Sequence, residues 1–295
     1  MKTRHRAILL VLTAAALLSL NGCGWDSSSN PTVIDLFVAD TPVDGADSVV
    51  IDFTGVQIQG ATGAPVEYDF PTPMSIDVLQ HEDDDFNILL DQQGIAHGHY
   101  QWIRLMVDMS KSSITLADGS QHPLVILSGD QTGLKLVSGF DVGSGQEVSL
   151  TVDFDLRKSI TLASGTYDFT PAMRLVDNSQ VVSMEGFVSN TFLIGATAVT
   201  APTCDPAAYI YAGSNITPVD INPTSKVQPV ATAAVYLDSF TGSYKYAADF
   251  LTPGTYTVAL VCAAGDDPAK ADSLTFAEPQ TVTLSTGFFT EVDFP

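Results

Sequence analysis

From Thr32 onward, the chain is a succession of short apolar or alternating segments separated by residues that favour turns. The clearest segment is 148–156, in which the apolar side chains occupy the even-numbered positions, as in a strand with one buried face. Turn sequences such as Asp118-Gly119 punctuate the pattern. Short strands at this spacing predict an all-β fold of antiparallel β-sandwiches. One segment, 86–93, has a helix-like pattern, and a loop with a single turn fits it equally well.

The composition changes between 181 and 203, where the chain loses most of its charged residues and gains Ala, Thr and Pro. We therefore place a domain boundary near Gln180 and expect one β-sandwich domain over 32–180 and a second over 181–295. The second segment contains about seven candidate strands, which predicts an immunoglobulin-like or transthyretin-like sandwich.

The N-terminus has three parts: basic residues, an apolar stretch over 7–20, and the sequence Leu20-Asn21-Gly22-Cys23. It resembles a bacterial lipoprotein signal peptide, whose final cysteine carries the lipid. The resemblance implies removal of 1–22, acylation of Cys23 and a polar tether over 23–31. Because Gly24 rather than Asp follows the cysteine, it further implies a lipoprotein of the outer membrane in a bacterial cell envelope, facing the periplasm or the surface.

The charge of the chain excludes one class of partner. The full sequence has 12 basic and 34 acidic residues, a formal charge of −22, and the signal segment contains three of the basic residues and none of the acidic ones. The mature chain would therefore keep nine basic residues and carry −25. Such a field repels nucleic acid, whereas an envelope protein, a polysaccharide or a divalent cation remains compatible with it.

Two cysteines remain once Cys23 is assigned to lipid. Cys204 and Cys262 are an even pair in an exported chain, which predicts a disulfide. On the chain-entropy model, a disulfide that closes a loop of this length would stabilise the folded state by roughly 4 kcal/mol. The alternative is two separate buried thiols.

The first domain resembles the bacterial family known as domain of unknown function 4382 (DUF4382). The resemblance extends over about 32–177, and the matching sequences, in chain order, are 40–47, 53–56, 98–105, 116–119, 128–136, Asp153-Phe154-Asp155-Leu156-Arg157-Lys158-Ser159 and Pro171-Ala172-Met173-Arg174-Leu175. It implies a β-rich exported domain and no particular chemistry. The second domain resembles the segment that often accompanies this family.

The densest polar constellation is Asp153, Asp155 and Arg157, which would share one face of a strand. We interpret it as a cross-strand ion-pair ladder, with Arg104 and Arg174 as candidate partners on other strands. The alternative is a catalytic acid and base of a hydrolase.

Two segments contain candidate metal ligands. The acidic residues Asp83, Asp84 and Asp85 offer the oxygen atoms that calcium prefers, although a solvated acidic loop explains them equally well. His97 and His99 would lie on one strand face and could hold zinc or copper, with His81 or His122 as a third ligand. Of these ions, we name only calcium as a candidate cofactor.

The sequence contains no nucleophile elbow and no glycine-rich phosphate loop. We therefore expect a lipid-anchored envelope protein with a non-catalytic binding or structural role toward a protein or polymer. The alternatives are calcium-dependent binding of a ligand or glycan, and a carboxylate-based hydrolase.

Overall fold

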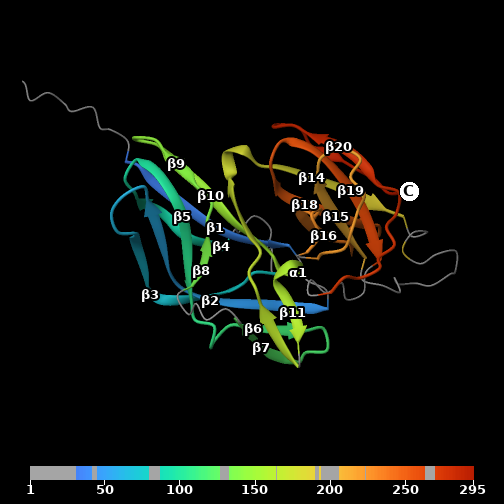
Figure 1. Cartoon of the computed structure of the whole chain (residues 1–295), viewed down its shortest axis with the longest axis horizontal. Coiled ribbons are helices and arrows are strands. Elements are labelled where there is room, and N and C mark those ends of the chain that lie inside the picture. The colour runs from blue at the N-terminus through green and yellow to red at the C-terminus, as the bar shows by residue number, and fades with distance from the viewer. Residues whose placement is uncertain are drawn as a thin grey trace, which may run out of the picture. The chain divides into compact units, whose positions relative to one another are not determined.

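The computed structural model describes residues 31–41, 45–79, 87–126, 133–163, 165–189, 193, 206–222, 224–262 and 270–295. Residues Pro31–Pro295 form one compact unit. The described chain is built almost entirely of strands (Figure 1), and its helices are one turn each, α1 (Leu156–Ser159) and η1 (Asn178–Gln180). None of these helices is long and apolar enough to span a bilayer.

The first sheet has four strands in the order β13-β10-β1-β4. Their bounds are Met173–Asp177 for β13, Glu147–Asp155 for β10, Val33–Thr41 for β1 and Asn87–Gly94 for β4. β1 runs parallel to β10 and antiparallel to β4, and β10 runs antiparallel to β13. A central pair of parallel strands explains why β10 is buried on both faces from Leu150 to Asp155, although only its even-numbered residues are apolar.

The second sheet has nine strands. Seven follow the order β11-β12-β7-β6-β2-β5-β8, while β3 pairs with β2 and β9 pairs with β5. The bounds are Ile160–Ala163 (β11), Thr166–Phe169 (β12), Gln121–Val125 (β7), Ser113–Leu116 (β6), Ala46–Gly60 (β2), Gly98–Val107 (β5), Leu134–Leu136 (β8), Val66–Asp77 (β3) and Phe140–Val142 (β9).

These two sheets bury their apolar side chains against each other. One core cluster contains Leu36 and Phe154 from the four-stranded sheet together with Phe53 and Ile103 from the nine-stranded sheet. Each of these side chains is at most 1% exposed. The burial of apolar side chains between the two sheets is the main stabilising contribution to such a sandwich.

The remaining strands form two further four-stranded sheets with the orders β17-β18-β14-β21 and β16-β15-β19-β20. The bounds are Tyr236–Leu237 (β17), Tyr244–Leu251 (β18), Val182–Val188 (β14), Thr290–Glu291 (β21), Ala231–Ala234 (β16), Pro206–Ala212 (β15), Gly254–Cys262 (β19) and Gln280–Leu284 (β20). A second core cluster joins Met184 and Tyr246 of one sheet to Ile210 and Leu260 of the other.

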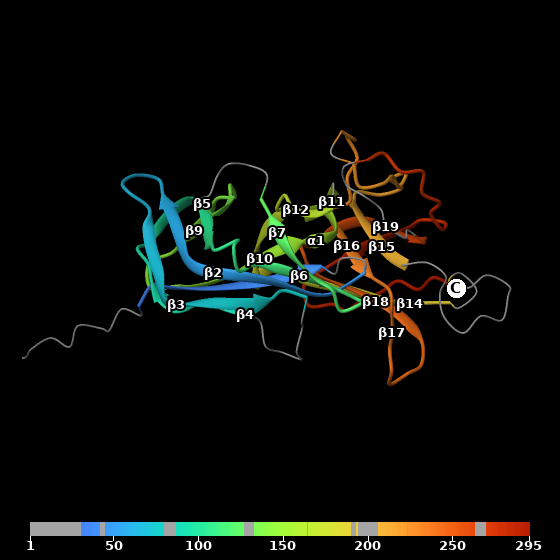
Figure 2. The ribbon, with the colours of Figure 1, turned by 90° about the horizontal axis from the view of Figure 1, so that it is seen from below.

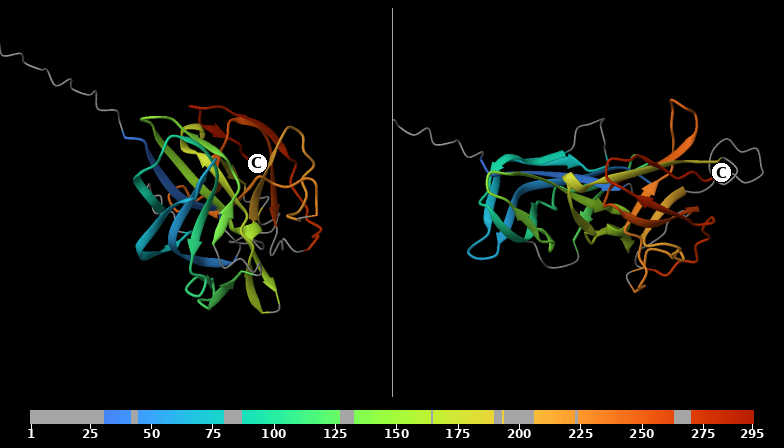
Figure 3. Two further views of the ribbon diagram at one scale, coloured as in Figure 1. Left: turned by 60° about the vertical axis from the view of Figure 1, so that its left-hand side comes forward. Right: turned by 90° about the horizontal axis from the view of Figure 1, so that it is seen from above.

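The all-β sandwich fold predicted from the sequence is therefore confirmed. No sheet within the described ranges combines strands from both sides of Gln180 (Figure 3). The division between the sheets therefore falls at the same place in the chain as the change in composition. The division into two domains stays a prediction, as does the likeness of the second one to immunoglobulin or transthyretin folds.

The helix-like pattern over 86–93 was misleading. β4 occupies Asn87–Gly94 as an edge strand whose Leu90 lies opposite Leu36 of β1. Leu89 and Leu90 are both buried. Gln92 has a φ of 47°, and its backbone N–H donates to Asp35 Oδ1 at 2.6 Å. This irregularity breaks the strict two-residue alternation and made the segment look helical.

A Gly-x-Tyr sequence recurs at 98–100, 165–167 and 254–256 and predicts tyrosines that anchor the start of a strand in the core. Tyr167 is only half-buried, whereas the other two fit the prediction. Tyr100 and Tyr256 are both buried, and each hydroxyl donates to the carbonyl four residues earlier, in Ala96 and Thr252 respectively, at 2.7 Å. The ring thus fills the core while the hydroxyl group closes the preceding turn.

Cys262, at the end of β19, is disulfide-bonded. It lies opposite Pro206 in the β15–β19 pair. Cys204 lies outside the described residues, so its pairing with Cys262 stays a prediction.

Candidate functional site

The polar constellation at the end of β10 is a buried ion-pair cluster. Asp153 is 3% exposed and lies directly opposite Arg174 of β13. Arg174 Nε donates to Asp153 Oδ2 at 2.5 Å. Burial raises the pKa of Asp153 to about 6, although attraction to Arg174 acts in the opposite direction. This pair joins two strands of one sheet in the core.

Arg157 does not continue the strand as the sequence suggested. β10 ends at Asp155, because the Asp155 side chain accepts the backbone N–H of Lys158 at 3.1 Å and caps the short helix α1. Arg157 therefore lies in α1, where its guanidinium is 5.8 Å from the ring centre of Tyr209. Lys158 forms an ion pair with Asp155 at 2.7 Å.

The basic side chains of this cluster also reach the backbone of later strands. Arg174 donates to the carbonyls of Phe250 at 2.9 Å and Asp249 at 3.2 Å. Lys158 Nζ donates to the carbonyl of Pro229 at 2.5 Å. Phe250 has a φ of 56°, a strained conformation for a bulky residue. The cluster thus ties the strands before Gln180 to those after it.

These contacts bear on the hydrolase alternative. Asp153 and Asp155 are 3% and 7% exposed, and each is paired with a cation. A general acid or base must come within hydrogen-bonding distance of its substrate, whereas both carboxylates here lie largely buried against cationic side chains.

Arg104 lies apart from this cluster. It is on β5 of the nine-stranded sheet, donates to Gln57 Oε1 at 3.3 Å and lies 5.1 Å from the ring centre of Trp102. Of the two candidate partners, only Arg174 contacts Asp153.

The predicted transition-metal ligands His97 and His99 lie around the start of β5. His97 and His99 are both exposed, and His99 Nδ1 lies 2.9 Å from Asp141 Oδ1. His122 hydrogen-bonds to Ser120. The described part of the chain contains no group of three potential ligands suited to a metal ion. The calcium candidates Asp83, Asp84 and Asp85, like His81 and the lipidation site Cys23, lie outside the described residues.

A different surface combines exposed aromatic and acidic side chains. It is the face of the β17-β18-β14-β21 sheet that points away from the core, and we call it the outer face. Strand pairing places Phe187 and Tyr236 on either side of Lys245, and Glu185 between Ala247 and Glu291. Phe187 is 39% exposed and Tyr236 is 45% exposed. Large apolar side chains that gather on a surface often mark a binding site.

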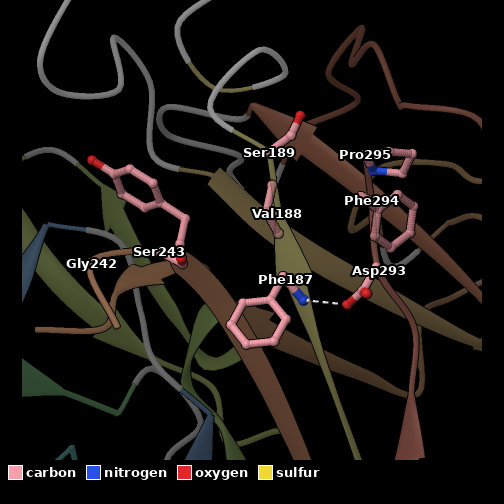
Figure 4. Close-up of a pocket in the computed structure, with 9 residues that line it drawn as sticks. Phe187, Val188, Ser189, Gly242, Ser243, Asp293, Phe294 and Pro295 are labelled. Atoms are coloured by element: carbon pink, nitrogen blue, oxygen red, sulfur yellow. Dashed lines mark hydrogen bonds between the residues drawn. The ribbon is translucent and has the colours of Figure 1, made fainter. Parts of the chain in front are cut away.

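A hollow of about 400 Å³ opens at one end of this face, within the range of ligand pockets. Figure 4 shows its lining: Phe187, Val188, Ser189, Gly242, Ser243, Tyr244, Asp293, Phe294 and Pro295. The backbone N–H of Phe187 donates to Asp293 Oδ1 at 2.8 Å, which holds this carboxylate at the edge of the hollow. The hollow is thus bordered by aromatic rings and one carboxylate.

The electrostatics of the outer face are dominated by acidic groups. The hydrogen bond with Asp238 raises the pKa of Lys245, and the same bond helps to lower the pKa of Asp238 to about 2. The ammonium and carboxylate atoms are 2.8 Å apart. The charge of Asp293, followed by burial and by Glu185, raises the pKa of Glu291. Three carboxylates therefore crowd one part of the face.

The pattern of the sequence did not lead us to this surface. The signal that could have revealed it is the alternation of β14. Val182, Met184 and Val188 are buried while Ser183 and Phe187 are exposed, so the period of two places Phe187 outside.

The β17–β18 hairpin extends this surface. Figure 2 shows the hairpin projecting from its sheet. Its turn contains Phe240, which is 97% exposed, and Asp238 Oδ1 accepts the N–H groups of Phe240 and Thr241 at 2.8 and 3.0 Å. A phenylalanine held this far into solvent by a structured turn gains stabilisation from burial only when another surface covers it.

No curated protein matches the chain. Among solved structures, the Bacillus anthracis TIE protein is similar, with a TM-score of 0.21 and 9% identity over 90% of this chain and 33% of that one. This chain therefore spans about a third of that protein's chain, and a likeness at this level carries no argument about fold or activity. Residues 32–171 match the model of the family described as a domain of unknown function, DUF4382, as expected from the sequence.

Proposed function

We propose that this chain is a lipid-anchored protein of a bacterial cell envelope that binds another envelope protein or a polymer without catalysing a reaction. The observation that carries the proposal is the outer face, where Phe187 and Tyr236 are exposed beside a hollow of about 400 Å³. Exposed aromatic side chains of this kind contribute strongly to binding interfaces.

The anchor is the second part of the proposal. Cys23 follows the residues that resemble a lipoprotein signal, so we assign it the acyl chains, and we place the protein in the outer membrane. Incorporation of labelled palmitate by the full chain, and its loss in Cys23→Ala, is the expected result. Equal labelling of the two chains would refute the anchor.

The remainder of the proposal concerns the disulfide expected in an oxidising compartment. We assign Cys204 as the partner of Cys262, which is disulfide-bonded. Peptide mapping without reductant should recover the two cysteines in one linked fragment. Recovery of Cys204 as a free thiol would contradict this pairing.

The binding role is tested by photo-crosslinking in bacterial cells that express the full chain. A photoreactive aromatic residue replaces Phe187 in one variant and Val137, which is 75% exposed in the loop after β8, in the control. We expect a discrete adduct from position 187 and none of that size from position 137. Identical patterns at both positions, or no adduct at 187, would overturn the binding role of the outer face.

A further inference from the structure

The outer face combines two features that suit a positively charged partner. Its carboxylates are Glu185, Glu291 and Asp293, and its cation is Lys245. The ammonium group of Lys245 is already paired with Asp238 at 2.8 Å. The face therefore carries an excess of negative charge within a chain that has 34 acidic and 12 basic residues.

The crowding of these carboxylates has a measurable consequence. Glu185 lies directly opposite Glu291 in the β14–β21 pair, an arrangement of like charges that destabilises a sheet. Mutual repulsion, chiefly from Asp293, raises the pKa of Glu291. A cation placed between these strands would relieve the repulsion, since opposite charges interact favourably at this distance.

The aromatic side chains beside the carboxylates favour the same kind of ligand. The Lys245 ammonium lies 5.7 Å from the ring centre of Tyr236, so this ring already attracts a cation through its π face. Phe187 lies across Lys245 from Tyr236, and its ring borders the hollow beside Asp293 (Figure 4). An aromatic ring next to a carboxylate attracts an ammonium or guanidinium group through two interactions at once.

We propose that the outer face of the β17-β18-β14-β21 sheet binds a lysine- or arginine-bearing segment of a partner protein. This inference rests on the proposed binding function and specifies its partner. The basic side chains lie against Glu185, Glu291 and Asp293, while apolar parts of the segment contact Phe187 and Tyr236. A neutral polysaccharide would use the rings but would gain nothing from the crowded carboxylates, which is why we favour the basic polypeptide.

The test uses the chain from Gly24 to Pro295, which contains the whole compact unit Pro31–Pro295. Fluorescence anisotropy measures the binding of labelled oligolysine and oligoglutamate peptides of equal length, and of a neutral oligosaccharide, at a fixed physiological ionic strength. The face variant is Glu185→Gln with Glu291→Gln. Its matched control is Glu67→Gln with Glu147→Gln, which removes the same charge from two exposed positions elsewhere.

We expect oligolysine binding to weaken about tenfold in the face variant, as two cation contacts are lost, and to change little in the control. Phe187→Ala should also weaken it. An equal loss in both double variants would overturn the proposal, because binding would then follow net charge alone. Binding of the oligosaccharide with no binding of oligolysine would also overturn it.

The two proposals fail in different ways. If photo-crosslinking at position 187 produces an adduct in cells while oligolysine does not bind, the binding role stands and the basic partner is refuted. If the crosslinking also fails, the face has no binding role at all. Far-UV circular dichroism of each variant verifies that the sheets remain folded.

Discussion

Replacing Asp153 with Asn removes a titrating group from the core while keeping its size. Asp153 is 3% exposed and accepts a hydrogen bond from Arg174 at 2.5 Å. The charge of Asp155 further raises the pKa of Asp153, and the charge of Lys158 lowers it. The amide keeps a hydrogen-bond acceptor for Arg174 but carries no charge at any pH, so wild type and variant differ in one ionisation.

The direction of the pH dependence follows from the pKa of Asp153. Burial raises it from 3.8 to about 6 in the folded chain, whereas it returns to about 3.9 on unfolding. The folded state therefore binds the proton more tightly. The stability that this proton contributes is fully present below about pH 4 and is lost as the pH rises through about 6. Two pH units at about 1.4 kcal/mol each amount to about 3 kcal/mol.

Urea unfolding at a series of pH values between about 4 and 7 tests this reasoning. Circular dichroism and the fluorescence of Trp102, which lies on β5, would follow the transition. The free energy of unfolding of wild type minus that of Asp153→Asn should fall by about 2 kcal/mol from the acidic to the neutral end of the series, because the unfolded carboxyl is already about half ionised at pH 4. A difference that stays constant, or that rises with pH, would refute a raised pKa at this site. The exposed carboxylate variant Asp91→Asn serves as the control for general charge effects.

Three further substitutions test other parts of the structure. Arg174→Ala should lower the free energy of unfolding by about 3–5 kcal/mol in urea, because a buried carboxylate loses its counter-ion; a loss below about 1 kcal/mol would contradict this role. Tyr246→Phe should cost about 1 kcal/mol, since its buried hydroxyl donates to the Val292 carbonyl at 2.8 Å; an unchanged melting temperature would argue against that bond. Gly186→Ala should cost about 1–3 kcal/mol by thermal unfolding, because a Cβ there would overlap the Val292 carbonyl oxygen; a neutral result would mean that this strand moves freely.

The strands of this protein could be predicted because their patterns are local. The segment 148–156 alternates as a strand should, and β10 occupies Glu147–Asp155. The exception was β4, where an irregularity at Gln92 disrupts the period of two. A pattern over a few residues has no information about the neighbouring strand that stabilises such an irregularity.

The charged residues were harder to place, because their roles depend on partners distant in the sequence. Arg157 follows Asp155 with the right spacing for one strand face, yet Asp155 caps a helical turn and redirects the chain. Arg174 was one of two candidates, and only strand pairing distinguishes it from Arg104.

By itself, the sequence determined the all-β class, the match to DUF4382 over 32–171 and the strong negative charge. These properties depend on composition and local periodicity, which hold in any arrangement of the strands. Only the tertiary structure decided that Asp153 pairs with Arg174 and that Phe187, Tyr236 and Glu291 share one outer face. Those contacts join residues from different strands, and the register that aligns them is set by how two sheets bury their apolar faces together.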